Sequence, residues 1–111
     1  MTMLPTSGSI KIAASDWQSG ERPGELIRKL VDDPRGYRSM LLKIEPGPLG
    51  ALHAHDEIEQ IYVMEGDFFD DEASYGAGDF LLRMPGTMHR AGSKNGCLMM
   101  IVYAPLVEAR G

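Results

Sequence analysis

Apolar and polar residues alternate along this chain in short runs, which glycine and proline residues separate. Residues 37–45 form the clearest run, with Met40, Leu42 and Ile44 on one face of a predicted strand. Residues 25–31 fit either a short helix or a strand, but turn residues flank them at hairpin spacing, which favours a strand. No segment predicts a long helix, so the pattern indicates an all-β barrel or sandwich.

The remaining elements are predicted from shorter signals. Residues 97–103 are almost continuously apolar, as in a strand that is buried on both faces. Residues 70–72, Asp-Asp-Glu, are expected to form an exposed hairpin tip, because hairpin ends are often charged. Trp17 is expected to anchor the N-terminal segment on the barrel. Further strands are predicted at residues 10–13, 61–64 and 80–84 and from His89 onward, with turns at residues 76–79 and 85–87.

Length and composition indicate one domain. With 111 residues and 43% hydrophobic content, the chain can build a single core. We expect the barrel to occupy residues 10–105, between a flexible N-terminus at residues 1–9 and a C-terminal tail at residues 106–111.

The strongest chemical signal lies in residues 47–66. His53 and His55 are two positions apart, so both imidazoles point to the same side of an extended strand. A polar turn and a return strand ending at Gly66 would bring the Glu59 carboxylate back towards them. Imidazole and carboxylate groups together suit first-row transition metals. These residues therefore predict a metal site, although a single histidine among apolar residues more often only makes a hydrogen bond.

The same segment resembles the first motif of the cupins. Residues that match the first motif are Gly47, His53, His55, Glu59 and Gly66, and those that match the second are Gly78, Gly86 and His89. The chain departs from the second motif at Met84 and Ser93, where cupins have proline and asparagine. The resemblance implies a double-stranded β-helix, or jelly roll, and a metal held by His53, His55, Glu59 and His89. The chain is most similar to the ChrR-like cupins, which include the C-terminal domain of an anti-sigma factor and relatives resembling a dihydroxyacetophenone dioxygenase.

The identity of the metal would decide what this site does. Four protein ligands complete a tetrahedral zinc site, which is closed and structural. Around an octahedral ion, the same four ligands leave two positions for water, dioxygen or a chelating substrate. We therefore expect a divalent transition metal: Fe, Mn, Ni, Cu or Zn. Glu57 lies two residues early for the motif, so we expect it at the surface or beside the ligands.

A pocket beside the metal is predicted from residues close to the two motifs. Most apolar residues there are expected to fill the core, since the interior of a small barrel must be filled. Arg38 and Arg83 could each hold a substrate carboxylate or enolate, or could simply be solvated. Cys97 is expected to be buried and inert. The predicted pocket residues are Tyr62, Met64, Phe68, Phe80, Arg83, Met100 and Tyr103.

Three functions are consistent with this reading of the residues and the resemblance. The first is a small metal-dependent dioxygenase acting on an oxygen-chelating molecule such as a hydroxyketone or diketone. The second is a non-enzymatic ligand- or redox-sensing module of the ChrR type, without the sigma-binding domain. The third is a metal-dependent isomerase or lyase.

Charge and composition limit the partners. The net charge of −5 offers no basic surface for nucleic acid. One cysteine fits a reducing compartment, and no apolar run approaches the ~20 residues of a membrane span. We expect a cytoplasmic protein that binds a small molecule and no membrane, and that forms a homodimer covering apolar residues on the outer side of its strands.

Overall fold

The computed structural model describes residues 7–14, 16–47, 50 and 54–106, and its regular elements are nearly all antiparallel strands. Within those ranges, no helix has the length and apolar character needed to cross a bilayer. The elements are a 3₁₀ helix, η1 (Ile12–Ala14), and the strands β1 (Gln18–Ser19), β2 (Glu25–Asp32), β3 (Arg38–Ile44), β4 (Glu57–Asp70), β5 (Ser74–Gly76), β6 (Phe80–Arg83), β7 (Ala91–Gly92) and β8 (Cys97–Pro105).

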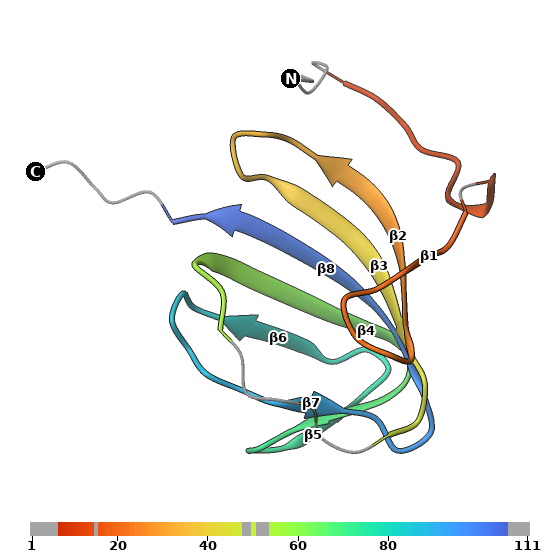
Figure 1. Cartoon of the computed structure of the whole chain (residues 1–111), viewed down its shortest axis with the longest axis vertical. Coiled ribbons are helices and arrows are strands. Elements are labelled where there is room, and N and C mark those ends of the chain that lie inside the picture. The colour runs from red at the N-terminus through yellow and green to blue at the C-terminus, as the bar shows by residue number, and fades with distance from the viewer. Residues whose placement is uncertain (1–6, 15, 48–49, 51–53, 107–111) are drawn as a thin grey trace, which may run out of the picture.

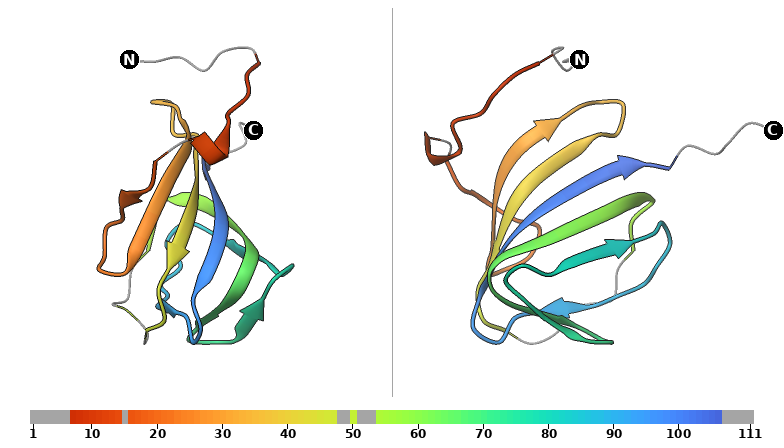
Figure 2. Two further views of the ribbon diagram at one scale, coloured as in Figure 1. Left: turned by 90° about the vertical axis from the view of Figure 1, so that its right-hand side faces the viewer. Right: turned by 180° about the vertical axis from the view of Figure 1, so that it is seen from behind.

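The central strand of the fold is β4. Neighbouring strands follow the order β1-β2-β3-β8-β4, and every pair is antiparallel. The first half of β4 also pairs with β6, and its second half pairs with β5 and β7. Figure 1 shows β2, β3, β8, β4 and β6 side by side in one curved sheet, with β5 and β7 at its lower end. The side and rear views in Figure 2 show the same curvature. The predicted all-β fold is confirmed.

Gly66 lets β4 bend in the middle instead of ending. Its φ is 80°, and a Cβ at this position would collide with the Gly96 carbonyl oxygen, so only glycine fits. The register with β8 shifts between Val63 and Glu65, and the Asp67 N–H still donates to the Gly96 carbonyl at 3.0 Å. The prediction that the strand ends at Gly66 is therefore wrong, because β4 has a bulge between Val63 and Glu65 and runs on past Gly66 to Asp70, where it pairs with β5 and β7.

Buried side chains from β4, β6 and β8 form the core. Alternate residues of β8 point inward, as the period of two in a strand requires. Leu98, Met100 and Val102, on the other face of β8, are only partly buried. The prediction that both faces of this strand are buried is thus wrong, because the outer face is not covered by a second layer of described residues. The core residues are Ile61, Val63, Phe68, Leu81, Cys97, Met99, Ile101 and Tyr103.

The N-terminal segment packs on β2 and β3. The Arg28 guanidinium lies 4.6 Å from the centroid of a Trp17 ring, and the Lys43 amine lies 6.0 Å from it. Arg28 Nη1 also donates to the Ile12 carbonyl at 2.9 Å. The predicted anchoring by Trp17 is confirmed. The strand predicted at residues 10–13 is wrong, because side chains rather than a backbone ladder hold this segment, and η1 occupies part of it.

Most other predicted elements are present. The strands expected at residues 25–31, 37–45, 80–84 and 97–103 correspond to β2, β3, β6 and β8. Both expected turns close with a backbone hydrogen bond, from Asp79 N–H to the Gly76 carbonyl and from Thr87 N–H to the Met84 carbonyl. The strand after the second turn, β7, begins two residues beyond His89. The expectations for residues 1–6 and 107–111 lie outside the described residues.

Candidate metal centre

Glu59 occupies the inner face of the central strand. In the register of the sheet it lies opposite Tyr103 of β8 on one side and Arg83 of β6 on the other. Its side chain is 4% exposed. A carboxylate at such a position needs a charged or hydrogen-bonding partner, because burial disfavours its ionised form.

Two histidines approach this carboxylate from loops. His55 Nε2 lies 3.9 Å from Glu59 Oε2, and His89 Nε2 lies 3.8 Å from Glu59 Oε1. The centroids of the two imidazoles are 6.5 Å apart. A hydrogen bond of 2.9 Å from the Gly86 N–H to the His55 carbonyl ties the loop before β4 to the turn after β6. The fold therefore brings together three of the four predicted ligands.

A backbone contact orients His89 with Nε2 towards Glu59. Its Nδ1 lies 3.3 Å from the Thr87 carbonyl oxygen, which can only accept a hydrogen bond, so this contact favours a proton on Nδ1. In a neutral imidazole, Nε2 then has a lone pair instead of a hydrogen. Such a backbone contact through the second ring nitrogen is the usual way in which a metal-binding histidine is oriented.

Glu59 Oε1 is a buried atom that lies 3.8 Å from His89 Nε2. Glu59 Oε1 is fully buried and makes no hydrogen bond with any residue that the structure describes. Metal–ligand bonds of ~2.1 Å allow two ligand atoms to lie up to about 4.2 Å apart. The separations of 3.8 and 3.9 Å fall within that limit. A cation between these atoms would satisfy the buried carboxylate oxygen of Glu59, so the donor set fits a metal.

The ligand set is not complete within the described part of the chain. No group of three His, Cys, Asp or Glu side chains among those residues is arranged closely enough to hold a metal by itself. His53, the remaining predicted ligand, lies outside the described residues. Its participation stays a prediction from the sequence.

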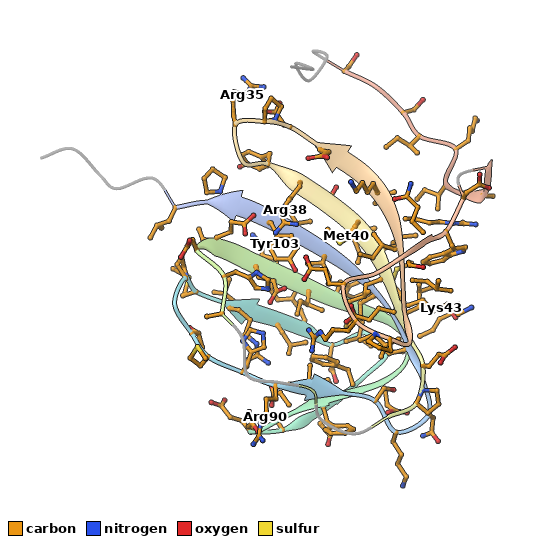
Figure 3. The ribbon with its side chains drawn as sticks, in the orientation of Figure 1. Arg35, Arg38, Met40, Lys43, Arg90 and Tyr103 are labelled. Carbon is orange, nitrogen blue, oxygen red and sulfur yellow. The ribbon has the colours of Figure 1, made fainter. Side chains whose placement is uncertain are left out.

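Tyr103 and Arg38 adjoin the histidines and Glu59. The Tyr103 ring packs edge-on against His55, with centroids 5.2 Å apart, and the Arg38 guanidinium lies 4.0 Å over its centroid (Figure 3). Burial, the charge of Glu59 and a hydrogen bond with Glu59 raise the pKa of Tyr103, so its hydroxyl stays protonated. Tyr103 is therefore a hydrogen-bond donor beside the candidate ligand.

Glu57 is the ion-pair partner of Arg38. Arg38 Nε and Nη2 donate to the two Glu57 carboxylate oxygens at 2.8 and 3.1 Å. The hydrogen bond with Arg38 lowers the pKa of Glu57, and the same contact raises the pKa of Arg38. Glu57 points to Arg38 rather than to the histidines, in agreement with the expectation that it is not a ligand.

A cavity of about 1100 Å³ opens on this site. His55, Glu59, His89 and Tyr103 line it, together with the predicted pocket residue Phe68. The rest of its wall includes an apolar surface made by Met40, Leu42, Ile44, Ile61, Met99 and Ile101. The site can therefore admit a small organic molecule whose apolar part packs away from the ligands.

Four predicted pocket residues do not line this cavity. Tyr62 and Met64 alternate with the inward-facing residues of β4, and they are 47% and 37% exposed. Phe80 is exposed on β6, and Met100 lies on the outer parity of β8. Their assignment to the pocket is corrected, because a strand places successive side chains on opposite faces.

Two further predictions are corrected, that Arg83 lines the pocket and that the acidic residues 70–72 are all exposed. Arg83 is turned inward but forms an ion pair with Asp70, which also accepts a hydrogen bond from the Tyr75 hydroxyl at 3.0 Å. Burial alone would raise the pKa of Asp70, but these bonds and two from backbone N–H groups lower it. Arg83 therefore braces the interior and does not line the cavity, and Asp70 is buried rather than exposed at a hairpin tip.

Ser93, one of the two departures from the second cupin motif, and Cys97 are both buried. Ser93 is 1% exposed, donates to the Asp67 carbonyl at 2.6 Å and accepts from the Gly96 N–H at 2.8 Å. It thus ties the turn before β8 to the bulge in β4. Cys97 is buried, and burial raises the pKa of its thiol to about 11, as expected for an unreactive cysteine.

Comparison with known families assigns this chain to a family. The model of the ChrR cupin-like domain matches residues 6–107. The chain belongs to this family. Comparison with curated proteins finds no match. The cupin resemblance carried by the histidine, glutamate and glycine residues is confirmed.

Solved cupin structures share the fold of this cupin. An RmlC-like cupin from Ralstonia eutropha JMP134 is 19% identical, with a TM-score of 0.79 over 89% of this chain and 69% of that one. A chain in the complex of Rhodobacter sphaeroides SigE with the anti-sigma ChrR is 21% identical, with a TM-score of 0.72 over 85% of this chain. This cupin spans about half, 52%, of that chain. The structure of Fe(II) HppE is 12% identical, with a TM-score of 0.75 over 89% of this chain and 60% of that one. These matches confirm the jelly-roll fold.

Proposed function

We propose that this cupin binds a divalent transition metal through His53, His55, Glu59 and His89. The observation that carries the proposal is Glu59 Oε1, which is buried without a hydrogen bond to any described residue and has His89 Nε2 3.8 Å away at the cavity wall. Burying a carboxylate oxygen without a donor is costly, and a cation held by Glu59 and the histidines would offset that cost. The ion is Fe, Mn, Ni, Cu or Zn.

We further propose that the protein is a small dioxygenase acting on an oxygen-chelating molecule such as a hydroxyketone or diketone. Four protein ligands leave two positions of an octahedral ion open, and the cavity offers room beside them. A metal held there would supply Lewis-acid and redox chemistry to a chelating substrate. A dioxygenase consumes one O₂ per substrate and places both oxygen atoms in the products, so the reaction needs no external reductant.

The residues around the ligands prepare the site in distinct ways. The Thr87 carbonyl keeps the Nε2 lone pair of His89 directed at the site. The protonated Tyr103 hydroxyl supports Glu59 by a hydrogen bond. The apolar wall, which includes Met40 and Met99, packs against the body of the substrate and displaces water from it.

Metal analysis and oxygen uptake test this function in sequence. Elemental analysis of protein purified without added metal is expected to find about one transition-metal ion per chain, and His55→Ala or His89→Ala is expected to remove it. Fe(II)-loaded protein is then expected to consume O₂ with a β-diketone, a hydroxyketone or a catechol. Metal without O₂ uptake would refute the dioxygenase. Turnover under strict anaerobiosis with zinc or manganese would instead indicate an isomerase or lyase.

A ligand- or redox-sensing module is the second candidate, and the match to the ChrR cupin-like family supports it. In that case peroxide or singlet oxygen is expected to release the metal and to alter binding of a protein partner. Unchanged metal content after oxidant treatment would rule out redox sensing.

We also propose a homodimer formed through the outer face of the sheet. Tyr62, Phe80 and Leu82 are 47%, 60% and 54% exposed there, and exposed apolar groups of this kind mark interfaces. Light scattering is expected to give twice the chain mass, and Phe80→Glu is expected to give a monomer. A monomeric wild-type protein would refute the dimer.

We also propose a reducing cytoplasmic location, which the buried Cys97, the single cysteine of the chain, supports.

A further inference from the structure

Arg38, Tyr103 and Glu59 form a row across three strands. Arg38 of β3 lies opposite Tyr103 of β8, and Tyr103 lies opposite Glu59 of β4. All three line the same cavity. Because neighbouring strands are ~4.8 Å apart, the row places Arg38 roughly 10 Å from Glu59, backbone to backbone. A small molecule at the candidate ligands can therefore reach the guanidinium.

The guanidinium of Arg38 is held in place but keeps unused donors. Glu57 accepts from Nε and Nη2, and the Tyr103 ring supports the guanidinium plane at 4.0 Å. No other hydrogen bond joins this guanidinium to a residue that the structure describes. A guanidinium has five N–H groups, so those of Nη1 remain available to a ligand. The side chain is 34% exposed, which leaves it accessible from the cavity.

The charges near the row favour an anionic ligand. The charges of Glu57 and Arg38 offset one another, and Glu59 offsets only one of the two charges of a divalent ion. A positive charge therefore remains at the metal end of the cavity, beside a planar donor group that matches a carboxylate. The apolar wall that begins with Met40, two residues along β3 from Arg38, suits the body of an organic acid.

We propose that Arg38 is a ligand-binding residue that selects small organic acids, which carry a carboxylate in addition to the oxygens that chelate the metal. Glu57 and Tyr103 position Arg38 for this contact. The inference rests on the proposed metal site and narrows its substrates to carboxylated molecules with an apolar body.

Titration calorimetry with two probes tests the inference. Catechol and 3,4-dihydroxybenzoate share the chelating oxygens and differ in the carboxylate. With manganese-loaded protein under argon, the carboxylated probe is expected to bind about tenfold tighter or more, the usual gain from a charge-assisted hydrogen bond. In Arg38→Gln the two probes are expected to bind with about equal affinity, and Arg38→Lys is expected to retain part of the preference for the carboxylated probe.

Arg35→Gln is the matched control. Arg35 also pairs with a carboxylate, that of Asp33 at 2.7 Å, but it lies in the loop between β2 and β3 and does not line the cavity (Figure 3). The preference for 3,4-dihydroxybenzoate is expected to be unchanged in this variant. Equal affinities in the wild type, or a preference that persists in Arg38→Gln, would overturn the inference.

Metal-free protein separates the two proposals. Benzoate has no chelating oxygens besides its carboxylate, and nuclear magnetic resonance titration is expected to show weaker benzoate binding by Arg38→Gln than by the wild type. If benzoate discriminates between these proteins but catechol fails to bind the metal-loaded form, Arg38 binds anions and the metal-chelation proposal fails. If catechol binds, 3,4-dihydroxybenzoate binds no tighter than catechol, and benzoate binds equally to the wild type and Arg38→Gln, the metal proposal stands and the Arg38 inference fails. Binding of neither probe would overturn both.

Discussion

Glu59 and Asp70 are two buried carboxylates on the same strand, and they differ in how their oxygens are satisfied. Asp70 accepts hydrogen bonds from two backbone N–H groups at 2.8 and 2.9 Å, from the Tyr75 hydroxyl and from Arg83. Glu59 Oε1 makes no hydrogen bond with the described residues and lies 3.8 Å from Nε2 of His89. Their burial is similar, at 8% and 4% exposed.

The difference shows which carboxylate stabilises the fold and which is prepared for a ligand. Hydrogen bonds from donors within the chain offset the cost of burying Asp70. At Glu59 the described residues supply no donor to Oε1, so a cation from outside would complete the site. Burial alone does not distinguish the two residues, but the number of hydrogen bonds that each carboxylate accepts from described residues does.

The largest expected effect is on stability, from Asp70→Asn. Removing one member of a buried ion pair leaves the other charge uncompensated, here that of Arg83, whose side chain is 12% exposed. We expect the free energy of unfolding to fall by about 3 kcal/mol in urea denaturation of the metal-free protein. The control is Asp71→Asn, which breaks a more exposed pair with Arg90 and should cost much less. Equal losses in the two variants would show that Asp70 does not brace the interior.

Glu59→Gln should weaken metal binding strongly and change stability little, the reverse of Asp70→Asn. Loss of the charged ligand is expected to weaken metal binding by about 100-fold or more, measured by competition with a chelator. The unfolding free energy of the metal-free protein should change by less than about 1 kcal/mol, because Glu59 makes no ion pair with a described lysine or arginine and its contacts with His55 and His89 are 3.9 and 3.8 Å long. Glu65→Gln, an exposed change on the same strand, should leave metal affinity unaltered. A destabilisation as large as that of Asp70→Asn would remove the contrast.

The stabilisation by Asp70 should depend on pH. Its pKa is lower in the folded protein than in the unfolded chain, so the folded state binds its proton less readily. The stabilisation is therefore present above the unfolded pKa of about 3.9 and is lost as pH falls through the folded pKa. The difference in unfolding free energy between wild type and Asp70→Asn should be constant from pH 7 to 5 and shrink from pH 5 towards pH 2. A constant difference over the whole range would contradict this assignment.

Tyr103→Phe should have the smallest effect. It removes the hydrogen bond that supports Glu59 but keeps the ring under Arg38 and against His55. Metal affinity is expected to fall by about tenfold, as for other residues that orient a ligand. The visible spectrum of Co(II)-loaded protein should shift, which a purely packing role would not produce. Tyr62→Phe, on the outer face of β4, is the control and should leave both affinity and spectrum unchanged.

Strand parity and the bulge in β4 together decide which predicted pocket residues line the cavity. Phe68 and Tyr103 line it, whereas Tyr62 and Met64 do not. Phe68 points inward although it lies an odd number of residues from Glu59, because the bulge between Val63 and Glu65 shifts the alternation. The sequence did contain a signal against these two, because Glu59 points inward and residues at odd offsets from it must point outward along the regular part of the strand. Aromatic and apolar character alone could not reveal the side on which a residue lies.

The sequence by itself determined the strand pattern, the glycine and proline turns, the cupin family and the residues expected to bind metal. The strands and turns follow from local spacing, because a period of two and a turn residue act within a few positions of the chain. The ligand set, which includes the distant His89, follows from the resemblance to the two cupin motifs. Only the tertiary structure decided that the Asp70 carboxylate is buried with Arg83, that β4 continues through Gly66, and that Glu57 pairs with Arg38. The row from Arg38 through Tyr103 to Glu59 likewise depends on the pairing and register of three strands distant in sequence. Local periodicity sets which residues of one strand share a face, but only the packed sheet sets which strands meet and which face is inside.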